Sequence, residues 1–225
     1  MEDPIKQSHV RLRLYLGILG ILLPIIIVVG DSIDKHSFLV QCSISHYYYT
    51  IMRNIFVGFL WAFGLFLVTY PGYKKENAKI SDDWLTNISG ILAIIVSLVP
   101  TICSRCIFCD VTDGHSNSLY NHIHLVSAGL FLILMGYMSY FRFTQSDKKK
   151  DTWENGKLQR NNIYRICAYF IWGSILVLIL NFAFNIISDE AFPQFVYTCE
   201  VVALWAFGFA WMVKGKALDK IMKWE

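Results

Sequence analysis

Six long apolar stretches, each almost free of charge, constrain this chain more than any other feature of its sequence. An α-helix needs about 20 mostly apolar residues to cross the hydrocarbon core of a bilayer. Backbone groups inside lipid must be hydrogen-bonded internally, which leaves helices or closed barrels. Barrel strands alternate with period two, and residues 18–29 show no such alternation. We therefore expect helical spans over about residues 12–30, 50–70, 84–101, 123–141, 163–187 and 195–213.

The overall composition agrees with a membrane location. Of the 225 residues, 55% are hydrophobic and 16% are charged, whereas an average soluble domain carries about 25% charged residues. A compact soluble fold of this size could not bury so much apolar surface, because its surface-to-volume ratio is too high. The sequence predicts an all-α fold: one polytopic membrane helix bundle with six transmembrane helices, covering residues 1–225.

The distribution of Lys and Arg predicts the orientation of this bundle. Alternate connectors carry 17 of these residues on one side and 2 on the other, and Arg53 lies inside a span. Positive residues concentrate in the cytoplasmic loops of membrane proteins. Both termini are therefore expected in the cytoplasm.

Polar side chains of the expected spans gather near the non-cytoplasmic ends. Charges inside spans are costly and usually mark a function or a partner. Arg53 and Glu200 lie roughly 5 to 7 Å from these ends at 1.5 Å per residue. We expect them to form an ion pair, with snorkelling of Arg53 to the interface as the alternative. The predicted ligand-binding residues of this layer are Ser45, His46, Arg53, Asn54, His124, Asn181 and Glu200.

The histidines of this layer leave two chemical roles open. Histidine can hold a metal or act as a general base near neutral pH, so His46, His122, His124 and Glu200 could form a hydrolytic zinc site. Ligands on one helix face lie three or four residues apart, which His122 and His124 do not. No catalytic residue and no cofactor is therefore expected, and zinc is the alternative.

Five of the six cysteines lie on or near the non-cytoplasmic side. Thiols on that side tend to oxidise, so disulfides are expected there. Metal binding and unpaired thiols are the alternatives, and the connectivity cannot be read from the sequence. The candidates are Cys42, Cys103, Cys106, Cys109 and Cys199.

One short sequence occurs twice. Residues 60–64 read LWAFG, and residues 204–208 read LWAFG again. Either an internal duplication or a shared way of packing helices at small residues explains the repeat.

Several motifs together carry a family resemblance. As a set they resemble a large, uncharacterised family of small bacterial integral membrane proteins, distantly similar to the six-span DRAM/Sfk type. The resemblance covers about residues 43–215 and implies six helices and a bacterial inner-membrane location, but no activity. The motifs are SISHYYYT at 43–50, MRNIFVG at 52–58, LVPT at 98–101, HLVSA at 124–128 and ALWAFG at 203–208.

A weaker resemblance is to the CREST membrane hydrolases, the superfamily of alkaline ceramidases and adiponectin receptors. That resemblance implies a zinc site built from Ser-x3-His, an Asp and His-x3-His. Here Tyr49 stands four residues after Ser45, position 54 is Asn, and no His-x3-His pair occurs. The sequence departs from the zinc pattern at each of these points.

Three functions fit this sequence. We expect a non-enzymatic membrane protein whose polar, outer-leaflet-facing site binds a lipid headgroup, a small ligand or a partner protein. A metal-dependent hydrolase acting on lipid is the first alternative. A small transporter or oligomeric channel is the second, although a conducting path usually needs polar groups near the midplane. The bilayer is the expected partner, nucleic acid is not, and the oligomeric state stays open.

Overall fold

The computed structural model describes residues 4–70, 82–102, 118–145 and 155–222. Every regular element within these ranges is a helix, which confirms the all-α prediction. In chain order they are α1 (Pro4–Asp34), the 3₁₀ helix η1 (Ile44–Tyr49), α2 (Arg53–Val68), α3 (Asp82–Leu98), α4 (Ser118–Tyr137), the π-helical η2 (Met138–Arg142), α5 (Asn155–Phe184), α6 (Phe195–Lys214) and the short α7 (Asp219–Met222).

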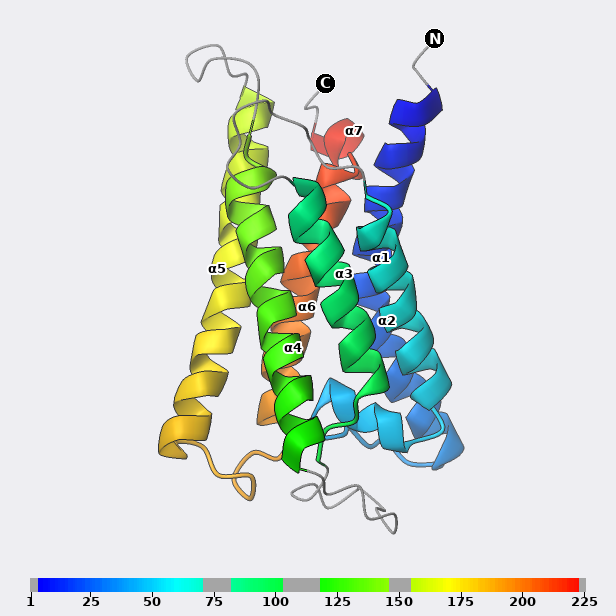
Figure 1. Cartoon of the computed structure of the whole chain (residues 1–225), viewed down its shortest axis with the longest axis vertical. Coiled ribbons are helices and arrows are strands. Elements are labelled where there is room, and N and C mark those ends of the chain that lie inside the picture. Colours follow the sequence, from blue (N-terminus) through cyan, green and yellow to red (C-terminus); the bar gives the residue numbers. More distant parts are fainter. Residues whose placement is uncertain (1–3, 71–81, 103–117, 146–154, 223–225) are drawn as a thin grey trace.

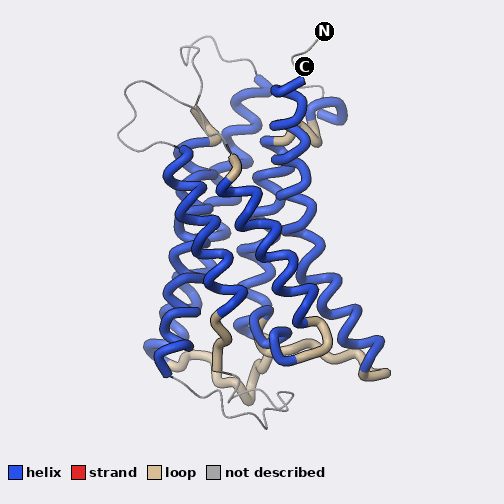
Figure 2. Tube along the Cα trace, turned by 45° about the vertical axis from the view of Figure 1, so that its right-hand side comes forward, coloured by secondary structure: helices blue, strands red, loops and turns tan. Residues whose placement is uncertain are grey.

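The helices α1 to α6 stand side by side in chain order as a bundle (Figure 1). Each packs against its neighbour in the sequence, and α6 closes the ring by packing along α1. The start of α1 and the short α7 lie at one end of the bundle, whereas η1 and the α5–α6 connector lie at the other. We call this second end the site end. Figure 2 shows the described loops gathered at the two ends of the long helices.

Four described helices are long and apolar enough to cross a membrane: Gln7–Asp34, Ser118–Arg142, Gly156–Phe184 and Phe195–Lys214. The prediction of six such spans is therefore wrong. The helix α2 has 16 residues, a rise of about 24 Å, which falls short of the roughly 30 Å hydrocarbon core. The helix α3 has 17 residues and is limited in the same way. An extended Thr50 shortens the second span, because it divides one apolar run between η1 and α2.

Two pairs of helices approach closely at glycines. A Cβ atom on Gly64 would lie 2.8 Å from the Gly90 carbonyl oxygen, and one on Gly90 would lie 2.5 Å from that of Gly64. The helices α1 and α6 meet in the same way at Gly17 and Gly208, with corresponding distances of 2.5 and 2.7 Å. Both copies of LWAFG thus end on a glycine at a helix crossing, as the packing explanation of the repeat requires.

Aromatic rings fill the middle of the bundle. The rings of Phe63 on α2 and Phe207 on α6 lie 5.6 Å apart between centroids, and Phe131 on α4 lies 6.0 Å from Phe207. All three side chains are buried. The centre of the bundle at these rings is therefore apolar and filled.

Candidate functional site

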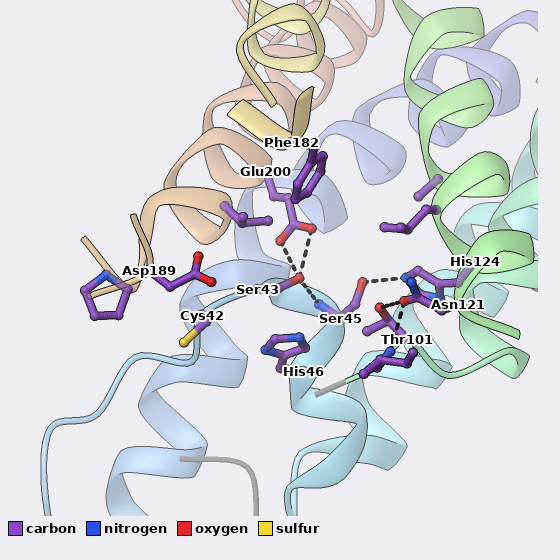
Figure 3. Close-up of a pocket in the computed structure, with 15 residues that line it drawn as sticks. Cys42, Ser43, Ser45, His46, Thr101, Asn121, His124, Phe182, Asp189 and Glu200 are labelled. Atoms are coloured by element: carbon purple, nitrogen blue, oxygen red, sulfur yellow. Dashed lines mark hydrogen bonds between the residues drawn. The ribbon is translucent and has the colours of Figure 1, made fainter. Parts of the chain in front are cut away.

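A cavity of about 380 Å³ lies at the site end, among η1, the first turns of α4, the end of α5 and the first turns of α6 (Figure 3). Pockets for small ligands commonly measure about 300–1,000 Å³. Its polar lining consists of Cys42, Ser43, Ser45, His46, Thr101, Asn121, His124, Asp189 and Glu200. Its apolar lining consists of Ile102, Leu125, Ala128, Phe182, Pro193 and Val196.

The carboxylate of Glu200 is bound by the first residues of η1. The Oγ atom of Ser43 lies 2.9 Å from both carboxylate oxygens, and the N–H of Ile44 donates to Oε2 at 2.6 Å. Ser43 is also the N-cap of η1, where its Oγ accepts a hydrogen bond from the Ser45 N–H at 3.1 Å. Glu200 therefore ties α6 to η1 and fixes the start of the segment that carries Ser45.

His124, buried on α4, bridges η1 and the end of α3. Its Nδ1 lies 2.6 Å from the carbonyl oxygen of Val99. A carbonyl can only accept, so Nδ1 carries the hydrogen and Nε2 of the neutral ring is an acceptor. The hydroxyl of Ser45 lies 2.8 Å from Nε2 and donates to it. Ser45 and His124 are thus held in one defined hydrogen-bonding arrangement, and both line the cavity.

Asn121 lies three residues before His124 and so shares a face of α4 with it. Its Oδ1 accepts hydrogen bonds from the Thr101 hydroxyl at 2.8 Å and from the Ile102 N–H at 3.0 Å. The N–H of Ile102 can only donate, so the amide atom that it contacts is the oxygen. The NH₂ group of the same amide then has no acceptor among the described residues. Asn121 therefore supplies a donor at the cavity.

His46 adds an uncharged ring to the lining. Its Nδ1 is buried and has no hydrogen-bond partner within the described part of the chain. Burial lowers the pKa of His46 to about 4; a backbone hydrogen bond at Ile102 opposes the shift, and the neighbouring His124 adds to it. At neutral pH this ring is uncharged.

The structure brings four of the seven predicted site residues to the cavity, and three lie elsewhere. Those at the cavity are Ser45, His46, His124 and Glu200. Asn54 is exposed on α2. Asn181 is buried near the end of α5, where its Oδ1 accepts from the N–H of Ile187 at 2.7 Å. That bond stabilises the turn after α5 and gives Asn181 a structural role.

The expected ion pair between Arg53 and Glu200 is wrong. Arg53 is exposed, donates to the hydroxyl of Tyr48 and lies 4.2 Å from the centroid of that ring. Two features explain the difference. The break at Thr50 starts α2 afresh at Arg53, and Glu200 is already bound by Ser43 and Ile44. The snorkelling alternative fits the observed position of Arg53.

Both a disulfide-bonded cysteine and free thiols occur among the described residues. Cys42 is disulfide-bonded, whereas Cys199 is a free thiol, which fits the alternative of an unpaired cysteine. No disulfide joins two described cysteines. The candidates Cys103, Cys106 and Cys109 lie outside the described residues.

Four polar residues of the cavity and one buried charge were not among the predicted site residues. The four at the cavity are Ser43, Thr101, Asn121 and Asp189; Asn121 could have been found from its spacing to His124. Asp31 was assigned to a loop, yet it is fully buried on α1.

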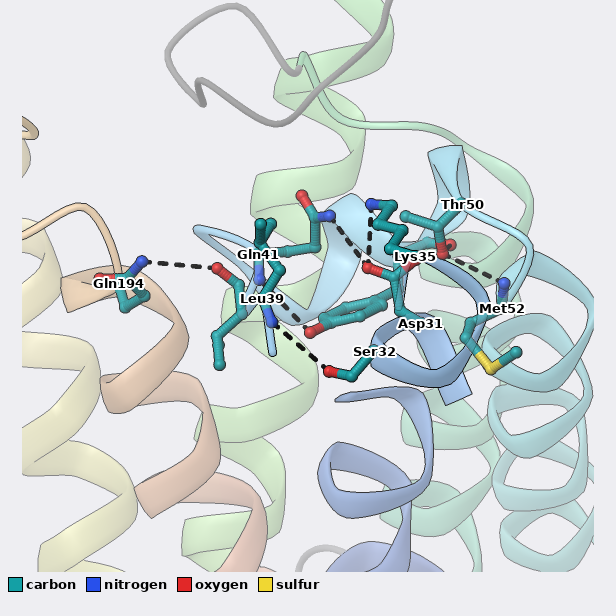
Figure 4. A network of polar contacts seen from close by, with 10 residues as sticks. Asp31, Ser32, Lys35, Leu39, Gln41, Thr50, Met52 and Gln194 are labelled. Carbon is teal, nitrogen blue, oxygen red and sulfur yellow. Dashed lines mark hydrogen bonds and ion pairs between the residues drawn. The ribbon is translucent and has the colours of Figure 1, made fainter. Parts of the chain in front are cut away.

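Asp31 belongs to a second polar cluster, which Figure 4 shows. Its Oδ2 pairs with Lys35 at 3.0 Å and accepts from the side-chain amide of Gln41 at 3.2 Å. The N–H of Gln41 lies 3.3 Å from the hydroxyl of Tyr47, which is itself buried in η1. This cluster fixes the chain between α1 and η1, and with it the segment that enters the cavity.

A metal site requires at least three ligand side chains placed close together. Within residues 4–70, 82–102, 118–145 and 155–222, no group of three His, Cys, Asp or Glu side chains is placed to hold a metal ion. His122, one of the ligands considered, is exposed and interacts with Ser118 on the first turn of α4.

Comparisons with known proteins give no relative. No family model matches the chain, and no curated protein or solved structure is significantly similar to it. The family resemblance drawn from the motifs therefore stays a prediction, and function has to be argued from the cavity.

Proposed function

We propose that the protein lies in a membrane and binds a lipid, with the ammonium group of the lipid headgroup in the site-end cavity. The observation that carries this proposal is the combination of surfaces in one cavity. Its polar side chains come from η1, α4, α6 and adjoining loop segments, whereas Leu125 on α4 and Phe182 on α5 are apolar and 45% and 58% exposed. A polar interior with an apolar, outward-facing rim suits a molecule with a polar head and a hydrocarbon chain. The chain would leave between α4 and α5.

The depth of the polar groups supports a headgroup rather than a soluble ligand. Glu200 lies five residues into α6 and His124 six residues into α4, which is about 8 and 9 Å at 1.5 Å per residue. Interfacial segments bury about 5–10 Å into the boundary between headgroups and acyl chains. A lipid in the outer leaflet would present its headgroup at this level.

The charges of the lining favour a headgroup that carries an ammonium group. Glu200 and Asp189 are both acidic, and the described lining contains neither Lys nor Arg. His46 is uncharged at neutral pH because its pKa is about 4. An ammonium group has only hydrogen-bond donors, so it complements carboxylate and imidazole acceptors.

We place the site end on the non-cytoplasmic side of the membrane. The support is the excess of Lys and Arg in the connectors and tails expected on the other side. Among the described residues, Arg160 pairs with Asp219 of α7 at that opposite end. The family resemblance adds a bacterial inner membrane to this proposal.

Photochemical cross-linking tests the lipid site. The full chain in nanodiscs is exposed to phosphatidylethanolamine, or to phosphatidylglycerol, with a diazirine in one acyl chain. We expect phosphatidylethanolamine to label peptides of α4 and α5 near Leu125 and Phe182. Ala128→Phe should block this labelling because it fills the cavity, whereas Val126→Phe, on the exposed side of the same helix, should not. Equal labelling of the two variants would show that the lipid does not enter the cavity.

A further inference from the structure

We propose that Ser45 is a nucleophile, activated by His124, that accepts an acyl group from an ester in the cavity. The inference rests on the proposed function, because the ester would belong to the lipid bound there. Its basis is the hydrogen-bonded series from Ser45 through His124 to the carbonyl of Val99.

The first requirement of such a site is a hydroxyl bonded to a base in the correct tautomer. Ser45 Oγ lies 2.8 Å from Nε2 of His124, within the 2.6–3.2 Å reach of a general base. The Val99 carbonyl, 2.6 Å from Nδ1, keeps the hydrogen on that nitrogen and leaves Nε2 free to take a proton. Such a base, oriented by a third group, is the arrangement that activates serine in acyl transfer.

The second requirement is access for the substrate and a donor for the developing oxyanion. Ser45 and His124 are buried from bulk solvent, yet both line the cavity. The amide of Asn121, on the same face of α4, is held by Thr101 and Ile102 through its oxygen. Its NH₂ group supplies the hydrogen-bond donor that an oxyanion needs.

The third requirement is a fixed nucleophile. Glu200 binds Ser43 and Ile44, and Ser43 in turn accepts from the N–H of Ser45. Glu200 is thus a positioning residue, which acts on the hydroxyl through the start of η1.

The step balances without any cofactor. The proton of the Ser45 hydroxyl moves to Nε2 of His124 as Oγ forms a bond to the ester carbonyl carbon. The bond from that carbon to the alkoxy oxygen then breaks, and the leaving alcohol takes the proton from Nε2. Water then repeats the sequence on the acyl-serine: it gives a proton to Nε2 of His124 as its oxygen bonds to the acyl carbon. The bond from that carbon to Ser45 Oγ breaks, Oγ takes the proton back from Nε2, and the carboxylic acid is released.

Covalent labelling of the full chain in detergent with an alkyl fluorophosphonate tests the inference. We expect mass spectrometry to find the phosphonyl group on Ser45, and no label on that peptide in Ser45→Ala. His124→Asn should slow labelling by roughly 100-fold or more, the usual contribution of a general base. His122→Asn, an exposed histidine two residues away, should leave the rate unchanged. No label on Ser45 in the folded protein, or equal rates in the two histidine variants, overturns the inference.

A second variant covers the case in which removal of the serine hydroxyl unfolds the chain. In Ser45→Cys, the rate at which iodoacetamide alkylates the new thiol reports on the base, His124. Mass spectrometry of the peptide that carries residue 45 measures this rate. A thiol beside an imidazole forms more thiolate at pH 7, so alkylation should be about tenfold faster than in the Ser45→Cys, His124→Asn double variant. Equal alkylation rates would again overturn the inference. If lipid cross-linking persists without labelling of Ser45, only acyl transfer fails; if both are absent, the lipid site fails as well.

Discussion

The contact between α1 and α6 gives a sharp stability prediction, because it joins two backbones directly. In Gly17→Ala, the new Cβ would lie 2.5 Å from the carbonyl oxygen of Gly208 and 2.7 Å from the backbone N of Met212. Ordinary contacts of a Cβ begin near 3.4 Å. The two helices must therefore separate by several tenths of an ångström along a contact that contributes to closing the ring.

Overpacking of this kind costs about 1–3 kcal/mol. Alanine also favours the helix by about 1 kcal/mol over glycine, so a matched control is needed. Gly58 on α2 is exposed, and a Cβ there would meet nothing within 4 Å. Gly58→Ala carries the same gain in helix propensity without the clash, and the difference between the two variants isolates the steric cost.

The assay is reversible unfolding in mixed micelles, with the free energy of unfolding taken from an SDS titration. We expect Gly17→Ala to be less stable than Gly58→Ala by about 1–3 kcal/mol. Equal stability of the two variants would refute the reasoning, because it would mean that α1 and α6 do not meet at Gly17.

Three further predictions concern the site end. The pKa of His46 falls from 6.5 to about 4 on folding. Between pH 4 and 6.5 the unfolded chain therefore binds more protons than the folded one. The free energy of unfolding should fall by up to about 3 kcal/mol as the pH drops from 6.5 to 4. His46→Asn should lose that dependence in SDS titrations across pH, and an unchanged slope would contradict the assignment. A double-mutant cycle of Glu200→Ala and Ser43→Ala should give a coupling of about 1.5–3 kcal/mol, as for hydrogen bonds to charged groups; simple additivity would show no contact. Glu200→Ala and Arg53→Ala should add within about 0.5 kcal/mol, since the two side chains do not meet.

The sequence predicted the helical character of the bundle and the location of most of its helices. Hydropathy identifies apolar stretches, but it does not mark where a helix begins or ends. The helix α4 begins at Ser118 instead of near residue 123, and the added turn carries Asn121. Likewise α1 continues to Asp34, and the extra turn carries the buried Asp31. Both omissions concern polar residues at helix ends, where an apolar window carries no signal.

The candidate site was predicted in part because its residues are costly in a membrane. Ser45, His124 and Glu200 meet at the cavity, although they lie on three elements far apart in the sequence. Arg53 and Asn54 were predicted to join them because both lie near the non-cytoplasmic end of the expected span 50–70. The extended backbone at Thr50 ends η1, and α2 then starts in a new direction. Periodicity alone cannot show such a break, since the local sequence remains apolar and aromatic.

Retention of a single lipid in native mass spectrometry tests the central claim most directly. The full chain is released from micelles that contain equal amounts of phosphatidylethanolamine and phosphatidylglycerol. We predict one retained phosphatidylethanolamine per chain, and none in Ala128→Phe. In Glu200→Gln the affinity for this lipid should fall about tenfold, which corresponds to a loss of about 1.4 kcal/mol of binding free energy. Equal retention of both lipids, or full retention by Ala128→Phe, would contradict a headgroup site in this cavity.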